Sequence, residues 1–174
     1  MSDAEALFTA HHRQIVRYLN RAVGHAETAR DLAQEVFLRV ARTPAPATND
    51  GEQRAWLFRI ARNLAIDYQR QQHRRPETPL AAAPVERSAA QDVGAAVNEA
   101  IATLPDLDRD VFLLRETAGL SYDEIAETCN LTTDAVRARI HRARLHLRER
   151  LAAPIAERRQ HPMRRDGRAT RETP

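Results

Sequence analysis

Residues 120–144, LSYDEIAETCNLTTDAVRARIHRAR, predict two helices joined by a tight turn, and the second helix is strongly basic. Ser121 is a favourable N-cap, and Glu124 three residues later completes a capping box. Asn130 tolerates the left-handed backbone that ends a helix, and Thr132 can cap the next helix. The stretch therefore predicts a helix–turn–helix, a motif whose second helix enters the DNA major groove.

The second helix of this pair has two different faces. Its apolar face follows helical spacing and consists of Val136, Ile140, Ala143, Leu147 and Leu151. The rest of the helix supplies the candidate DNA contacts, which are Thr133, Asp134, Arg137, Ala138, His141, Arg142, Arg144 and Arg148. Among them we expect Arg142, Arg144 and Arg148 to hold phosphates, and Asp134, Arg137, Ala138 and His141 to reach base edges.

Charge changes sign abruptly at this helix. Residues 93–134 hold nine acidic residues against two Arg, a net charge of −7, whereas residues 137–150 hold six Arg against Glu149, a net charge of +5. A run of charge is usually only a solvated helix face. A boundary this sharp at a candidate recognition helix favours contact with DNA phosphates instead.

The composition predicts an all-α protein with two small helical domains. The chain has 174 residues, only 5% aromatic residues and five glycines, and no stretch alternates polar and apolar residues for long. Cys129 is the one cysteine, which excludes an intramolecular disulfide. Because no signal pattern or membrane-length apolar run appears, we expect a cytoplasmic protein without membrane insertion.

The first half predicts helices over 5–23, 27–42 and 53–75, with a loop over 43–52. In the first helix, Phe8, Ile15, Leu19 and Val23 share one face. In the second, an inward stripe consists of Leu32, Ala33, Val36 and Val40, and an outer stripe of Asp31, Gln34, Glu35 and Leu38. The outer stripe could dock a protein, although one exposed Leu needs no explanation.

The outer face of the helix predicted over 53–75 carries cations, an aromatic ring and an amide. Its candidate contacts are Trp56, Arg59, Arg62, Asn63, Ile66 and Arg70. Single-stranded nucleic acid is bound by this combination, since cations pair with phosphates, rings stack on bases and amides reach base edges. The alternative is that Trp56 plugs the domain core.

Proline content and the distribution of large apolar residues divide the chain into four segments. The first domain covers 5–75, and a flexible linker covers 76–92 because its three prolines disfavour a helix. The second domain covers 93–152, with a helix to about Thr103 and a further helix whose one face carries Leu107, Val111, Leu114 and Ala118. Residues 153–174 combine Pro, Gly and Arg with few large apolar residues, which predicts a disordered basic tail.

Two motif blocks resemble a known family. Residues 31–40, DLAQEVFLRV, and 56–68, WLFRIARNLAIDY, are similar to region 2 of bacterial extracytoplasmic function (ECF) sigma factors. Residues 104–116, 119–126 and 136–144 resemble region 4 of the same family. The resemblance covers roughly residues 5–152 with both regions in the family's order, so it is far more specific than a lone helix–turn–helix.

The resemblance implies an alternative sigma factor that binds core RNA polymerase and promoter DNA and is held by an anti-sigma factor. Asp31, Gln34, Glu35 and Leu38 would then lie on the helix that docks the polymerase. The loop 43–52 and the following helix would open the minus-10 element, where a base is flipped from the stack and Asn63 occupies a contact position. The helix from Thr132 would recognise the minus-35 element.

Three departures from the family pattern concern the promoter sequence rather than the fold. The loop 43–52 lacks the Phe-Arg-Gly type of sequence that many relatives carry, so the residues of its base pocket are not assigned. Ala135 replaces a common Thr, and Cys129-Asn130 replaces a Leu-Gly turn.

Two other classes of function fit the sequence less well. An autonomous helix–turn–helix regulator would dimerise on a palindrome, but the basic, aromatic helix over 53–75 and the lack of a dimer seam argue against it. An enzyme has little support, because the seven His residues show no metal-ligand spacing and no Gly-rich phosphate loop appears. We therefore expect no catalytic residue, no metal and no cofactor.

Overall fold

The computed structural model describes residues 3–43, 49–74 and 89–159, and side chains are described for residues 4–43, 49–74 and 94–152. Within those ranges every regular element is an α-helix, which confirms the all-α prediction. The helices are α1 (Asp3–Val23), α2 (Ala26–Arg42), α3 (Asp50–Arg74), α4 (Ala89–Ala102), α5 (Asp106–Glu116), α6 (Tyr122–Cys129) and α7 (Thr133–Arg159). None of the helices in the described part is long and apolar enough to cross a membrane.

The first three helices pack around large apolar side chains that are fully buried. Ile15, Tyr18 and Leu19 of α1 meet Val36 of α2 and the adjacent pair Leu57 and Phe58 of α3. The rings of Tyr18 and Phe58 meet edge to face, with their centroids 5.6 Å apart, a favoured geometry for an aromatic pair. The helix α2 buries Ala33, Val36 and Val40, as its inward stripe predicts.

One apolar residue of the predicted face of α1 is more exposed than the others. Phe8 is 46% exposed, whereas its neighbour Leu7 is buried. Phe8 lies at the edge of the core, where its ring contacts the ring of Phe37 with centroids 4.9 Å apart. The spacing of Phe8 relative to Ile15 suits an inward face, but at that end of α1 the outer surface of α2 supplies the contact.

The helix–turn–helix forms as the sequence predicts. Ser121 Oγ accepts the Glu124 N–H at 3.1 Å, and Glu124 Oε2 accepts the Ser121 N–H at 2.6 Å, which completes the capping box. Asn130 takes the left-handed conformation with φ 54°, and Thr132 Oγ1 accepts the Ala135 N–H at 3.2 Å. Val136, Ile140, Ala143 and Leu147 are buried, so the predicted apolar face of α7 is confirmed.

Three segment boundaries differ from the prediction. The helix α3 begins at Asp50, inside the predicted loop, since Asn49 Oδ1 accepts the Glu52 N–H at 3.0 Å and Asp50 and Glu52 favour a helix N-terminus. The helix α4 begins at Ala89, inside the predicted linker, because the last of the three prolines lies before it. The helix α7 continues through Pro154 to Arg159, seven residues into the predicted tail. Residues 44–48, 75–88 and 160–174 lie outside the described ranges.

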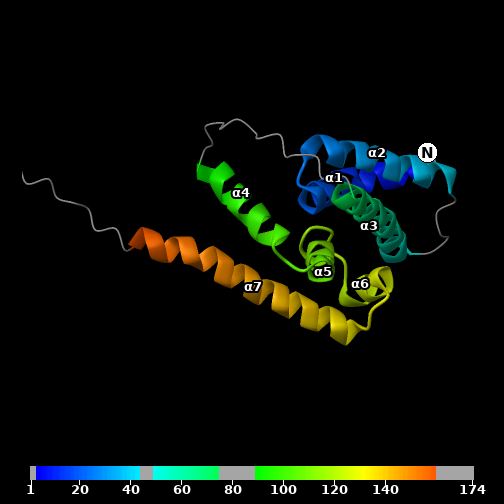
Figure 1. Ribbon diagram of the computed structural model, residues 1–174. Helices are drawn as coiled ribbons and strands as arrows, with labels where there is room; N and C mark the ends of the chain where they lie inside the picture. The colour runs from blue at the N-terminus through cyan, green and yellow to red at the C-terminus, as the bar shows by residue number, and fades with distance from the viewer. Residues whose placement is uncertain (1–2, 44–48, 75–88, 160–174) are drawn as a thin grey trace, which may run out of the picture.

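The two halves of the chain pack directly on one another. Figure 1 shows α5 and α6 between the three N-terminal helices and the long helix α7. Arg17 of α1 donates through Nη2 to the Thr117 carbonyl at the end of α5, at 3.1 Å. Cys129 at the end of α6 is half-buried, and burial raises the pKa of its thiol to about 11, so the thiol stays protonated at neutral pH.

Candidate nucleic-acid interface

The polar face of α7 is open to solvent over its first four turns. Seven of the eight side chains predicted to contact DNA are exposed, namely Asp134, Arg137, Ala138, His141, Arg142, Arg144 and Arg148. The eighth, Thr133, is half-buried because its hydroxyl donates to Asp123 Oδ1 of α6 at 2.8 Å. Burial of Val136 and Ile140 on the opposite side turns this face outward. The arrangement suits a helix presented to a duplex groove.

Two of these arginines pair with acids that lie at the surface. Arg137 donates to Asp134 at 2.9 Å, with side chains 60% and 90% exposed, and its guanidinium lies 5.7 Å from the Tyr122 ring centroid. Arg144 donates to Glu116 at 2.7 Å, also at the surface. Exposed pairs are worth about 0–1 kcal/mol. Both arginines can therefore exchange their partners for DNA at little cost.

Arg142 and its neighbour Arg139 are held differently, by one buried acid that the sequence did not reveal. Asp108 of α5 is 5% exposed, and it accepts Arg139 Nη1 at 2.6 Å. It also accepts Arg142 through both nitrogens of one edge, Nε at 3.2 Å and Nη2 at 3.3 Å. Burial favours the neutral carboxyl, but the hydrogen bonds from Arg142 and Arg139 outweigh it and hold the pKa of Asp108 below its ordinary value.

On α3, the aromatic and amide candidates share a hollow of about 350 Å³. It is lined by Trp56, Ile60 and Asn63 of α3 together with Arg39, Arg42 and Thr43 at the end of α2. Trp56 also packs on the hydrophobic core. Its side chain therefore contributes to core packing, as the alternative interpretation expects, and lines the hollow as well. Because the hollow also reaches the ring and the Asn63 amide, it combines an aromatic ring, an amide and two cations.

Two of the three cationic candidates of α3 face the C-terminal half instead. Arg59 donates to Glu127 of α6 at 2.9 Å, and Arg62 pairs with Asp110 of α5 at 3.0 Å. Arg54, which was not among the candidates, pairs with Glu124 at 3.2 Å. In this arrangement Arg59 and Arg62 can reach a nucleic acid only by giving up those carboxylates.

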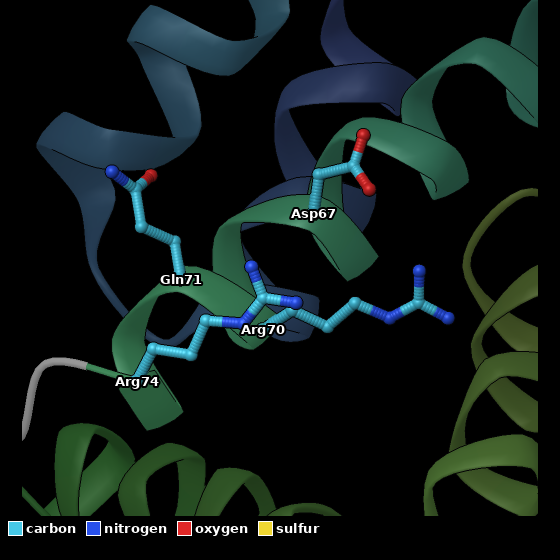
Figure 2. Close-up of a pocket in the computed structure, with 4 residues that line it drawn as sticks. All are labelled: Asp67, Arg70, Gln71 and Arg74. Carbon is cyan, nitrogen blue, oxygen red and sulfur yellow. The ribbon is translucent and has the colours of Figure 1, made fainter.

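The remaining two candidates of α3 lie further along the helix. Ile66 is half-buried, and Arg70 is exposed. Figure 2 shows Arg70 and Arg74 projecting from the last turns of α3, with Asp67 and Gln71 around the same open hollow of about 450 Å³. This end of α3 is therefore cationic and accessible.

The outer stripe of α2 is accessible along its length. Asp31, Gln34 and Leu38 are exposed, and Leu38 is 50% exposed. Glu35 is half-buried and accepts Arg39 Nε at 2.8 Å. The exposed ring of Phe8 and the half-buried Phe37 continue the apolar surface onto α1. The stripe thus combines acidic, amide and apolar groups on one rigid helix.

The structure also shows which residues sequence reasoning missed. Asp108, Asp110, Glu124 and Glu127 all pair with arginines that lie 31 to 70 residues away along the chain. The signal available was the net charge of residues 93–134. It indicated an acidic surface but could not identify the partner of each acid.

Comparison with known proteins finds two family models along the chain. The model described as Sigma-70 region 2 matches residues 7–75, and the model described as Sigma-70, region 4 matches residues 95–147. The chain is 34% identical over 173 residues to the ECF RNA polymerase sigma factor SigE of Mycolicibacterium smegmatis, covering 90% of this chain and 65% of that protein.

Two further similarities cover most of both chains. The ECF RNA polymerase sigma factor SigC of Mycobacterium tuberculosis is 34% identical over 138 residues, or 75% of this chain and 72% of that protein. In a solved complex from Bartonella quintana, the sigma factor RpoE is bound to the anti-sigma factor NepR. The matching chain of that complex has a TM-score of 0.70 at 22% identity, with coverage of 87% of this chain and 98% of the other.

Proposed function

Since this chain belongs to the ECF group of the sigma-70 family, we propose that it is an alternative sigma factor that directs core RNA polymerase to specific promoters. One observation carries the proposal. Both sigma regions occur in one chain in the family's order, and the second forms a helix–turn–helix whose α7 presents an exposed basic face. The protein acts by binding rather than by catalysis, in the cytoplasm where promoter and polymerase meet.

The direct test is run-off transcription with purified core polymerase and a pool of genomic promoter fragments. Defined transcripts should appear only when the chain and the core enzyme are both present. Tight binding to a duplex palindrome without polymerase, together with no polymerase-dependent transcript, would favour the autonomous regulator instead.

We assign recognition of the minus-35 element to α7. Asp134, Arg137, Ala138 and His141 lie at its exposed N-terminal end, the part of a recognition helix that contacts base edges. Arg144 and Arg148 lie further along and contact phosphates. Arg142 differs from them because Asp108 already accepts two of its hydrogen bonds.

Arg137→Ala is expected to lower promoter selectivity. A good bidentate contact to a base contributes about 1–3 kcal/mol of discrimination, which corresponds to roughly 5- to 150-fold. The measurement is the ratio of affinities for a selected minus-35 duplex and a scrambled duplex. Arg148→Ala is the matched control, since loss of a phosphate contact weakens both duplexes alike. If Arg137→Ala also weakens both alike, Arg137 only holds the backbone.

We assign opening of the minus-10 element to α3 and the adjoining end of α2. The hollow formed by Trp56, Ile60 and Asn63 supports this assignment, because a base that has left the stack needs an aromatic surface and a polar group. Arg39 and Arg42 at its rim supply charge for the phosphates on either side. Arg70 and Arg74 extend the cationic surface beyond it.

We assign polymerase docking to the outer stripe of α2, namely Asp31, Gln34, Glu35 and Leu38. Glu35→Arg should weaken core polymerase binding at least about tenfold, because a reversed charge at an interface repels its former partner. The fold should remain intact, since the exposed Glu35–Arg39 pair contributes about 0–1 kcal/mol. Affinity is measured by titrating labelled chain with core enzyme.

Glu99→Arg is the matched control for this experiment. It makes the same charge change on an exposed residue of α4, away from the proposed stripe of α2. It should leave the affinity close to that of the wild type. An unchanged affinity of Glu35→Arg would remove the stripe from the polymerase contact.

We also propose that an anti-sigma factor binds this chain. The fold shared with the sigma factor in the NepR complex supports the proposal. Co-purification of the chain from its own cells, with the bound partner identified, tests it. The partner should prevent run-off transcription when it is added before the core enzyme.

A further inference from the structure

Asp108 occupies an unusual place in the C-terminal half. It lies near the start of α5 and is 5% exposed, and its single carboxylate meets two guanidinium groups. Both belong to α7, at positions 139 and 142, in the middle of the helix assigned to the minus-35 element. Buried carboxylates need such partners, because an unpaired buried charge is costly.

The two arginines differ from the others on α7 in how much freedom they have. The side chain of Arg139 is only 28% exposed, and its guanidinium bonds Asp108 at 2.6 Å. Arg142 is 55% exposed but uses one whole edge of its guanidinium on Asp108. By contrast, the acids that pair with Arg137 and Arg144 are 90% and 42% exposed. Glu116 also belongs to α5 but lies at the surface, so among the described ion pairs of α7 only those with Asp108 have a buried acid.

From this geometry we infer that Asp108 is a positioning and specificity-determining residue for the recognition helix. It holds Arg139 and Arg142 against α5 and thereby keeps them from adding sequence-independent contacts to DNA phosphates. The inference rests on the proposed role of α7. Each arginine freed to neutralise a phosphate would strengthen binding to any sequence alike, and specificity would fall.

Asp108→Asn is the first test, because it removes the charge and keeps the shape. Binding of the full chain to a scrambled duplex is measured by fluorescence anisotropy between about 50 and 200 mM salt. The slope of log affinity against log salt should steepen by about 0.9 for each new phosphate contact, an extra change of about threefold over that range. The ratio of selected to scrambled affinity should fall.

Asp106→Asn is the matched control. It changes the net charge equally on the same helix, but its side chain is 81% exposed and pairs with Arg109 of α5 rather than with α7. Its slope should remain that of the wild type. The double variant Asp108→Asn/Arg142→Gln should bring the slope back toward the wild-type value. A purely structural role predicts weaker binding by Asp108→Asn to both duplexes with no steeper slope, and that result would overturn the inference.

Arg139→Gln provides a test that does not depend on the folding of Asp108→Asn. It leaves Asp108 paired with Arg142, and its slope should equal that of the wild type. A slope shallower by about 0.9 would mean that Arg139 contacts phosphate and would reject the inference. If the wild type binds selected and scrambled duplexes equally, the minus-35 assignment fails, while the slopes on scrambled DNA still test how Asp108 holds its arginines.

Discussion

Replacing Arg62 by alanine is expected to lower the free energy of unfolding by about 3–5 kcal/mol, the usual cost of removing one partner of a buried ion pair. The side chains of Arg62 and Asp110 are only 15% and 11% exposed. They join α3 to α5 across the contact between the two halves. Without the guanidinium, the buried Asp110 carboxylate loses its hydrogen-bond donor, and the nearby Arg109 already pairs with Asp106.

The loss should depend on pH in a defined direction. Burial raises the pKa of Asp110 above its ordinary value even with Arg62 nearby, and removal of Arg62 takes away a group that lowers it. The folded variant would then bind a proton at a pH where the unfolded chain has released it. Its stability should therefore fall as pH rises from the ordinary Asp range through the raised pKa. Urea unfolding at about pH 5 and pH 7.5 should show a larger deficit at pH 7.5.

Two variants distinguish the stability lost with the buried Arg62–Asp110 pair from the effect of removing any positive charge. Arg59→Ala removes a neighbouring cation whose pair with Glu127 is exposed, so it should cost about 0–1 kcal/mol. Arg62→Met/Asp110→Leu replaces both partners by apolar groups and should recover most of the stability, as swaps of buried pairs often do. Equal losses for Arg59→Ala and Arg62→Ala would show that burial of the Arg62–Asp110 pair is not decisive.

Local signals in the sequence predicted the helix–turn–helix closely. The capping box at Ser121, the left-handed Asn130 and the apolar face of α7 each depend on residues within about two turns of one another. The same holds for the inward stripe of α2. These features were confirmed because neighbouring residues determine them.

The ion pairs could not be predicted from the sequence. Three arginines of α3 pair with acids that lie 48 to 70 positions away along the chain, namely Arg54, Arg59 and Arg62. The spacing of residues within one helix does not indicate which other helix will pack against that face. The sequence predicted that the whole outer face of α3 binds nucleic acid. The structure divides it into arginines paired with α5 and α6 and a hollow around Trp56 and Asn63. The experiments on α3 therefore have to treat these two parts separately.

The hollow around Trp56 and Asn63 leads to the second large expected effect. Trp56→Leu/Asn63→Ala should reduce initiation from a duplex promoter by roughly 30- to 1000-fold. Stacking of a base on an aromatic ring contributes about 1–3 kcal/mol, and the amide hydrogen bond about 1 kcal/mol more. Leu at position 56 keeps apolar packing against the core while it removes the large ring. Initiation is measured by abortive-product synthesis on linear duplex templates.

A template with a preformed mismatched bubble at the minus-10 element distinguishes strand opening from structural damage. If Trp56 and Asn63 stabilise the flipped base, most of their contribution offsets the cost of unpairing, which the bubble has already removed. The double variant should then approach wild-type activity on the bubble and remain defective on the duplex. A variant whose fold or polymerase docking is damaged would be defective on both templates alike. Val16→Ala, a half-buried substitution on α1 that packs on the same core and lies outside every proposed DNA contact, is the control for packing loss, and it should affect the two templates equally. An equal defect of the double variant on duplex and bubble would leave Trp56 as a core residue and move strand opening elsewhere on the chain.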